Sequence, residues 1–96
     1  MAEITDMRQE IDKLDKELLN VLTKRFEFCK KIGIVKLKNG QALKVPEREE
    51  EVLSHCTQVA KELGLESNFV RKLFSLIMAQ SVALEEKQKN LQINIY

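Results

Sequence analysis

The sequence is poor in residues that interrupt helices and in residues that build metal centres. It has one proline, Pro46, and three glycines among its 96 residues, so long uninterrupted helices are possible. Two cysteines, Cys29 and Cys56, occur without a Cys-x-x-Cys pair, and His55 is the single histidine. A zinc site or a disulfide is therefore poorly supported. We expect free, buried, reduced thiols, a histidine on the surface and no bound metal.

The sequence also lacks an excess of one charge and any long apolar run. Lys and Arg number 16 against 15 Asp and Glu, a formal net charge of +1, whereas nucleic-acid-binding proteins usually carry a basic excess. No apolar run reaches the roughly 18 residues of a transmembrane helix, and no signal-peptide pattern is present. We therefore expect a cytoplasmic protein that binds neither nucleic acid nor membranes.

Apolar residues recur at helical spacing along the whole chain, which predicts an all-α fold in a single domain over 1–96. The expected helices span about 5–37, 46–63 and 67–89, with a frayed tail over 90–96. Thr5 is a candidate N-cap of the first helix, Pro46 suits the first turn of the second, and Gly64 is a good stop for it.

The first helix is too long for a compact domain of this size. At 1.5 Å per residue it would extend about 50 Å, whereas a domain of about 100 residues has a radius of gyration of about 13 Å. Half of the helix would protrude with its leucines in water unless a second chain covered them. We therefore predict an intertwined homodimer.

The apolar stripe of the first helix contains three cations. The stripe reads Ile4, Arg8, Ile11, Asp15, Leu18, Leu22, Arg25, Cys29, Ile32, Lys36. Burying an unpaired cation costs several kcal/mol, so Arg8, Arg25 and Lys36 are expected to face an anion. This pattern predicts that the helical bundle holds an acidic small molecule.

Helical geometry divides the three cations into two groups. Arg25 and Lys36 lie three turns apart on one face, roughly 16 Å along the axis, so their side chains can reach one small ligand. Arg8 lies about 25 Å from Arg25 and can serve only a site built around a partner chain. The alternatives are an intersubunit ion pair for Arg8 and snorkelling to solvent for the other two.

Further polar candidates occur on the other two helices. Ser81 and Glu85 lie one turn apart on the third helix, and Arg48 and Glu49 open the second. Each could equally be a solvated surface residue. No nucleophile–base pair and no glycine-rich phosphate loop occur. Cations, one hydroxyl and carboxylates together suit binding of a dianion and stabilisation of charge by hydrogen bonds.

Several segments resemble the all-helical chorismate mutases. The similar segments are MRQEIDKLD at 7–15 continued by Leu18, Leu19 and Arg25, then GIVK at 33–36, PERE at 46–49, and Ser81. The first segment, with its leucines and arginine, is similar to the LRxxIDxLD opening of that family. GIVK is similar to its GxxK motif, PERE to its xRE motif, and Ser81 to its third-helix serine. The resemblance extends from residue 7 to about residue 88.

The resemblance implies an intertwined dimer that converts chorismate to prephenate in aromatic amino acid biosynthesis, without a cofactor. The reaction is a Claisen rearrangement within one molecule. The implied roles place Arg25, Ser81 and Arg8 of the partner subunit at the substrate carboxylates, with support from Arg48. A bidentate arginine fork suits a carboxylate.

The remaining implied roles concern the ether oxygen and the ring hydroxyl. Lys36 would contact a carboxylate and the ether oxygen, and Glu85 would face that oxygen from the other side. Glu49 would accept a hydrogen bond from the ring hydroxyl.

Many family members have glutamine where this chain has Glu85, and a carboxyl group donates only when protonated. We therefore expect Glu85 to have a raised pKa and activity to fall as pH rises. Val45 replaces an acidic residue that some relatives place near the ring hydroxyl.

Two other functions fit the same residues. An isochorismate-pyruvate lyase on this scaffold would use the same cations, and a non-enzymatic helical dimer could bind a ligand without converting it. The short chain also favours a monofunctional enzyme without a feedback site of its own.

Overall fold

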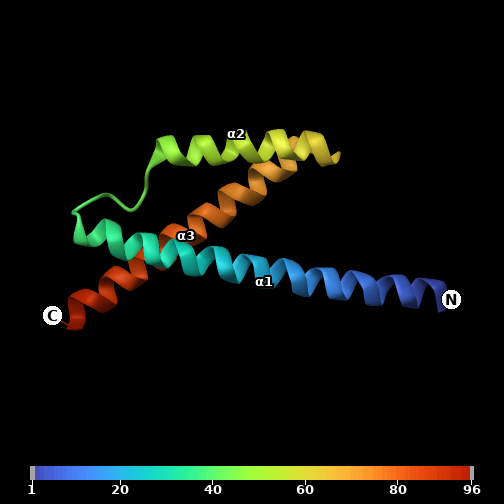
Figure 1. Ribbon diagram of the computed structural model, residues 1–96, viewed down its shortest axis with the longest axis horizontal. Helices are drawn as coiled ribbons and strands as arrows, with labels where there is room; N and C mark the ends of the chain where they lie inside the picture. Colours follow the sequence, from blue (N-terminus) through green and yellow to red (C-terminus); the bar gives the residue numbers. More distant parts are fainter. Residues whose placement is uncertain (1, 96) are drawn as a thin grey trace.

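A computed structural model describes the backbone of residues 2–95 and the side chains of residues 2–91. Within that part of the chain all regular structure is helical: α1 is Ala2–Lys38, α2 is Pro46–Leu63 and α3 is Ser67–Ile95 (Figure 1). The predicted all-α, three-helix chain is therefore confirmed. None of the described helices is long and apolar enough to cross a membrane.

The helix ends follow local sequence signals. Gly40 has a φ of 67° in the turn after α1, a left-handed conformation that suits glycine. Pro46 opens α2 and is preceded by Val45 in an extended conformation. Gly64 ends α2 with a φ of 74°, and the next N–H, from Leu65, donates to the carbonyl of Ala60 at 2.8 Å. This left-handed cap is the expected helix stop.

Two predicted boundaries were wrong. Helix α1 begins at Ala2, so Thr5 lies inside the helix and does not cap it. Helix α3 continues to Ile95, so the frayed tail is wrong for residues 90–95, and Tyr96 lies outside the described residues. No proline or glycine follows Gly64 in the sequence, and nothing local ends α3 at the expected position.

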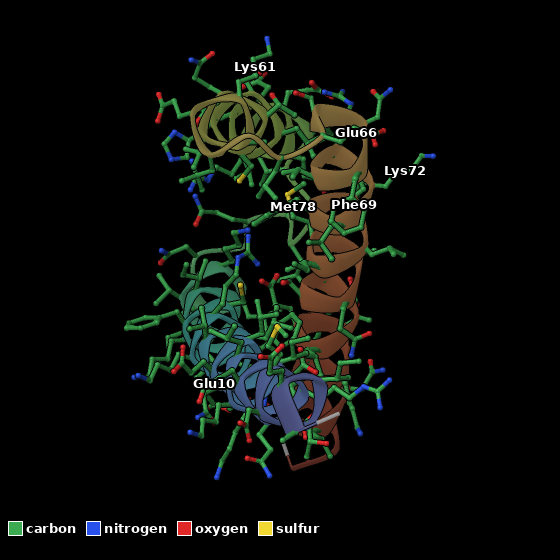
Figure 2. All side chains as sticks on the ribbon, turned by 90° about the vertical axis from the view of Figure 1, so that its right-hand side faces the viewer. Glu10, Lys61, Glu66, Phe69, Lys72 and Met78 are labelled. Carbon is green, nitrogen blue, oxygen red and sulfur yellow. The ribbon has the colours of Figure 1, made fainter. Side chains whose placement is uncertain are left out.

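Helix α3 is the element that joins the other two. It packs against α2 on one side and against the C-terminal half of α1 on the other, whereas the backbones of α1 and α2 do not approach each other closely within residues 2–95 (Figures 1 and 2). The buried apolar side chains are Leu43, Leu53, Ala60, Val70, Ile77 and Met78. Most of this core lies between α2 and α3.

The N-terminal half of α1 extends away from the other helices (Figure 1). Every residue from Ala2 to Val21 is exposed, and Leu18 and Leu19 are 62% and 63% exposed. The radius of gyration is 17.2 Å and the longest extent 59 Å, whereas a compact domain of about 100 residues has a radius of gyration near 13 Å. The single chain thus leaves a long apolar stripe in water.

Candidate active site

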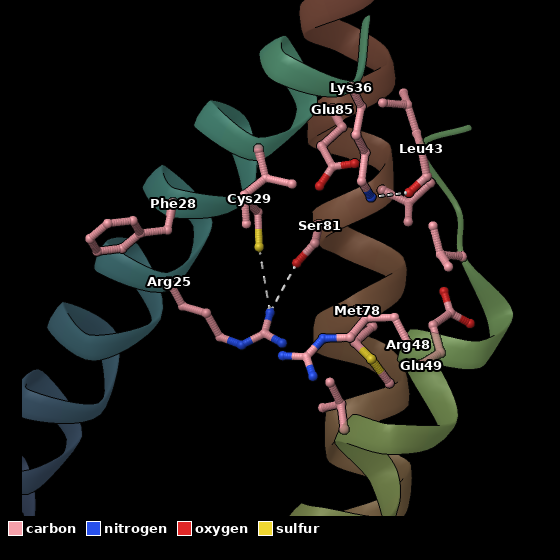
Figure 3. Close-up of a pocket in the computed structure, with 14 residues that line it drawn as sticks. Arg25, Phe28, Cys29, Lys36, Leu43, Arg48, Glu49, Met78, Ser81 and Glu85 are labelled. Atoms are coloured by element: carbon pink, nitrogen blue, oxygen red, sulfur yellow. Dashed lines mark hydrogen bonds between the residues drawn. The ribbon is translucent and has the colours of Figure 1, made fainter. Parts of the chain in front are cut away.

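A cavity of about 480 Å³ lies where α1, α2 and the loop between them meet α3. Its lining includes every predicted site residue except Arg8, namely Arg25, Lys36, Arg48, Glu49, Ser81 and Glu85. Figure 3 shows these side chains approaching one another from the three helices. Residues far apart in the sequence therefore share one pocket. Helical spacing predicted this for Arg25 and Lys36, and the family resemblance implied it for the others.

Arg25 is held in the cavity by neutral groups. Its Nη1 donates to Ser81 Oγ at 3.2 Å, and Ser81 Oγ in turn donates to the Ile77 carbonyl at 2.9 Å (Figure 3). The guanidinium also lies 6.0 Å from the centre of the Phe74 ring, within cation–π range. No carboxylate among the described residues forms an ion pair with Arg25. Its orientation is fixed while its charge remains available for an anion.

Lys36 is positioned in a similar way by the loop that follows α1. Its Nζ donates to the carbonyl of Leu43 at 2.9 Å (Figure 3), and Leu43 is itself buried. The loop is anchored to the end of α1, because the N–H of Gln41 donates to the Lys36 carbonyl at 2.8 Å. A carbonyl oxygen orients an ammonium group without neutralising it, so Lys36 also keeps a free charge.

Glu85 is the least solvated acid of the cavity. The residue is 5% exposed, and its Oε2 is buried without a hydrogen-bond partner among the described residues. Burial raises the pKa of this carboxyl above its ordinary value of 4.5; Lys36 opposes the shift and Glu86 adds to it. The protonated form is thereby favoured, and a protonated carboxyl can donate a hydrogen bond into the cavity.

Arg48 and Glu49, in the first turn of α2, line the outer part of the cavity. Arg48 Nη1 lies 3.1 Å from Glu51 Oε2, and both side chains are largely exposed. Glu49 Oε1 lies 3.9 Å from Lys44 Nζ. Both pairs are weak surface interactions, worth about 1 kcal/mol or less, so a ligand could displace them.

Arg8 is the one predicted site residue that the chain does not bring to the cavity. It is exposed on the N-terminal half of α1, about 25 Å along the helix from Arg25. The prediction that Arg8 acts from a partner chain concerns an assembly and stays a prediction.

Sequence reasoning missed two groups of the site. Cys29 was interpreted only as a buried thiol, yet its Sγ accepts from Arg25 Nη1 at 3.8 Å and it lines the cavity. Its position one turn after Arg25 was the available signal. The Leu43 carbonyl that holds Lys36 has no such signal, because loop residues show no periodicity.

The cavity therefore combines two oriented cations, a third cation, Arg48, at the rim, a hydroxyl and a buried carboxyl. The ligand class that matches this set is a small organic dianion with an additional oxygen that accepts a hydrogen bond.

Residues 7–86 match the family model described as "Chorismate mutase type II". The chain belongs to this family, and the resemblance found in its sequence motifs is confirmed.

Individual relatives agree with this assignment. The T-protein of Enterobacter agglomerans is 35% identical over 85 residues, which are 88% of this chain and 23% of that protein. A bifunctional chorismate mutase/prephenate dehydratase of Buchnera aphidicola (subsp. Schizaphis graminum) is 33% identical over 88 residues, 92% of this chain and 23% of that protein. The chain thus spans about a quarter of the length of these curated relatives. A chorismate mutase of Methanocaldococcus jannaschii, 24% identical over 87 residues, is covered over 88% of its length.

Proposed function

We propose that the protein catalyses the rearrangement of chorismate to prephenate, a step of aromatic amino acid biosynthesis. The observation that carries the proposal is the presence, within one cavity, of the oriented Lys36 ammonium and the buried carboxyl of Glu85, whose Oε2 has no hydrogen-bond partner among the described residues. The reaction breaks a C–O bond and forms a C–C bond in one molecule. It needs no nucleophile and no cofactor, which agrees with the residues in the cavity.

The first task of the site is to fold the substrate into the reactive conformation. Arg25, already oriented by Ser81, would bind one carboxylate through its guanidinium fork, and the Ser81 hydroxyl lies close enough to contact the same group. Fixing both ends of a flexible diacid removes part of the conformational entropy cost from the chemical step, because the substrate is already folded when it reacts.

The second task is to stabilise negative charge that develops on the ether oxygen. Lys36 would donate to this oxygen from the α1 side, and protonated Glu85 from the α3 side. Donors placed where charge develops typically contribute about 3–4 kcal/mol each in a site that excludes water. Because both groups are held before substrate binds, little reorganisation is required.

The rim residues would orient the rest of the substrate. Arg48 would exchange Glu51 for a substrate carboxylate, and Glu49 would accept from the ring hydroxyl in place of Lys44. Val45 lines the cavity with an apolar surface, so Glu49 is the acceptor side chain at this end of the proposed arrangement.

We further propose a cytoplasmic, intertwined homodimer. The exposed apolar stripe on the N-terminal half of α1 supports this assembly, because single chains rarely leave such a surface in water. In a two-fold dimer, the same stripe would place Arg8 of the partner subunit at the second substrate carboxylate.

An assay of the purified protein with two substrates tests the activity. Incubation with chorismate should yield prephenate, and incubation with isochorismate should yield no salicylate or pyruvate. Salicylate formation without prephenate would assign the lyase activity instead. Binding of chorismate without any product would identify a non-enzymatic ligand-binding dimer.

A further inference from the structure

Gly33 occupies an unusual place in the fold. It is the one buried residue of α1 within the part of the chain that the structure describes, and it lies against Glu85 of α3. Its backbone is helical, unlike Gly40 and Gly64, whose φ values are positive. Glycine is among the poorest helix formers, and no conformational need explains it here. A glycine at position 33 is therefore explained by the space that the absent side chain leaves.

That space is filled by Glu85. A Cβ atom placed on Gly33 would lie 2.8 Å from Glu85 Cγ, 3.2 Å from its Cβ and 3.4 Å from its Cδ. These are the three nearest heavy atoms outside the local helix backbone, so the stem of Glu85 lies directly against the bare backbone of α1. A separation of 2.8 Å between two carbon atoms is well inside their contact distance of about 3.5–4.0 Å.

We propose that Gly33 is a positioning residue, which provides the slot that directs the Glu85 carboxyl into the cavity beside Lys36. The inference rests on the proposed function, because it assigns Gly33 a role through a group of that site. Gly33 itself touches no substrate. The helix backbone forms one wall of the slot and limits the rotamers that Glu85 can adopt.

The groups around Glu85 explain why the slot matters for the burial and position of its carboxyl. The charged groups that line the cavity near Glu85 are Arg25 and Lys36 from α1 and Arg48 and Glu49 from α2, with Glu86 adjacent on α3. A methyl group at position 33 would push the Glu85 stem toward the open side of the cavity, where water reaches the carboxyl. The carboxyl would then lose both its burial and its position relative to Lys36.

The test is Gly33→Ala, studied in the wild-type chain and in a Glu85→Ala background. Alanine favours the helix, so thermal unfolding and circular dichroism should show a folded protein. We expect kcat to fall about tenfold to a hundredfold with KM changed less than about threefold, since a misplacement near 1 Å can cost about a hundredfold. In the Glu85→Ala background, which lacks Cγ and the carboxyl, the same substitution should change kcat less than about twofold.

A second readout does not depend on activity. In protein labelled with ¹³C at the glutamate carboxyls, the Glu85 resonance should titrate at a lower pH in Gly33→Ala than in wild type, because the displaced carboxyl is hydrated. Inactivity of the wild-type protein would refute the proposed function, while this titration would still test the slot.

Three outcomes would overturn the inference. They are an unchanged Glu85 titration, an equal loss of kcat in both backgrounds, and unfolding of Gly33→Ala in both backgrounds. A Gly33→Ala protein that folds only together with Glu85→Ala would support it, since the clash would then be with Glu85.

Discussion

The two halves of α1 share one periodic stripe but have different surroundings. From Arg25 onward the stripe packs on α3 and lines the cavity, with Gly33 buried against Glu85. Before Leu22 the same spacing continues, yet every described residue is exposed. The 37-residue helix thus contains a half that packs on another helix of the chain and a half that no other described helix covers.

The comparison separates the three cations of the stripe into two groups. Arg25 and Lys36 are oriented by neutral groups of the chain itself, so their positions are set before any ligand binds. Arg8 has the same place in the periodic pattern but lies on the uncovered half. If a partner chain covers that half, Arg8 becomes a site residue.

The largest effect is expected from Arg25→Ala, in the half that packs within the chain. Loss of an oriented guanidinium that binds a carboxylate should cost about 4 kcal/mol, within the range of about 2–5 kcal/mol for truncating a buried charge pair. The value of kcat/KM should therefore fall about a thousandfold. Steady-state kinetics with chorismate measure this loss, and the melting temperature should stay the same or rise, because an unpaired charge is removed.

Arg71→Ala is the matched control for that variant. Arg71 is an exposed arginine of α3 that lies 3.4 Å from Glu50, outside the proposed site. Its loss should change kcat/KM less than about twofold, because a surface pair is worth at most about 1 kcal/mol. Equal activity of the two variants would remove Arg25 from the catalytic machinery.

The next largest effect is expected from Leu18→Glu, which tests whether a partner chain covers the N-terminal half of α1. If the stripe is an interface, a two-fold axis doubles the loss of about 1.5 kcal/mol for each leucine. The dissociation constant of the dimer should then rise about a hundredfold. Sedimentation at several protein concentrations measures this shift, and activity should become dependent on concentration.

Lys16→Glu, on an exposed and polar position of the same segment, is the control for Leu18→Glu. It adds acidic charge without removing an apolar group from the stripe. A Leu18→Glu chain with the same association state as Lys16→Glu would show that the stripe is not an interface.

The contrast between the halves also explains what could be predicted from the sequence. The 3.6-residue period sufficed to find three helices and to place Arg25 and Lys36 on the inward stripe of the first. For Ser81 and Glu85 it gave only a separation of one turn, and the resemblance to the chorismate mutases was needed to predict them as site residues. Two groups at the site could not be found in this way. The Leu43 carbonyl belongs to a loop, and the contact of Gly33 with Glu85 depends on where α1 crosses α3, which no local pattern encodes.

The helix ends show the same limit. Gly64 was predicted correctly because a left-handed cap is a local requirement. Thr5 was a wrong choice of cap, since a polar residue near a helix start is compatible with several starting positions.

A smaller effect concerns the proton on Glu85. Burial raises its pKa above 4.5, so the protonated donor is lost as pH rises through the raised value. Wild-type kcat/KM should then fall about tenfold per pH unit above that pKa, and Glu85→Gln, which always donates, should give a flat profile from about pH 5 to about pH 8. A wild-type rate that does not vary over this range, together with no change in Glu85→Gln, would refute the role of the proton.

The same shift affects stability with a defined sign. The folded state binds the Glu85 proton more tightly than the unfolded state, so this stabilising contribution is complete below 4.5 and is lost as pH rises through the folded pKa. The melting temperature of Glu85→Gln relative to wild type should therefore increase with pH.

The smallest expected effect is the recovery of about a quarter of wild-type activity when two inactive variants are mixed. It compares the two halves of α1 most directly. Arg8→Ala and Arg25→Ala should each be nearly inactive as pure proteins. When they are mixed and allowed to exchange subunits, half of the dimers carry one chain of each kind. In such a dimer one site keeps Arg25 from its own chain and Arg8 from the partner subunit, while the other site has neither. About one quarter of all sites should therefore recover activity if Arg8 acts across the interface. If Arg8 acted within its own chain, neither site of a mixed dimer would contain both arginines, and mixing would restore nothing.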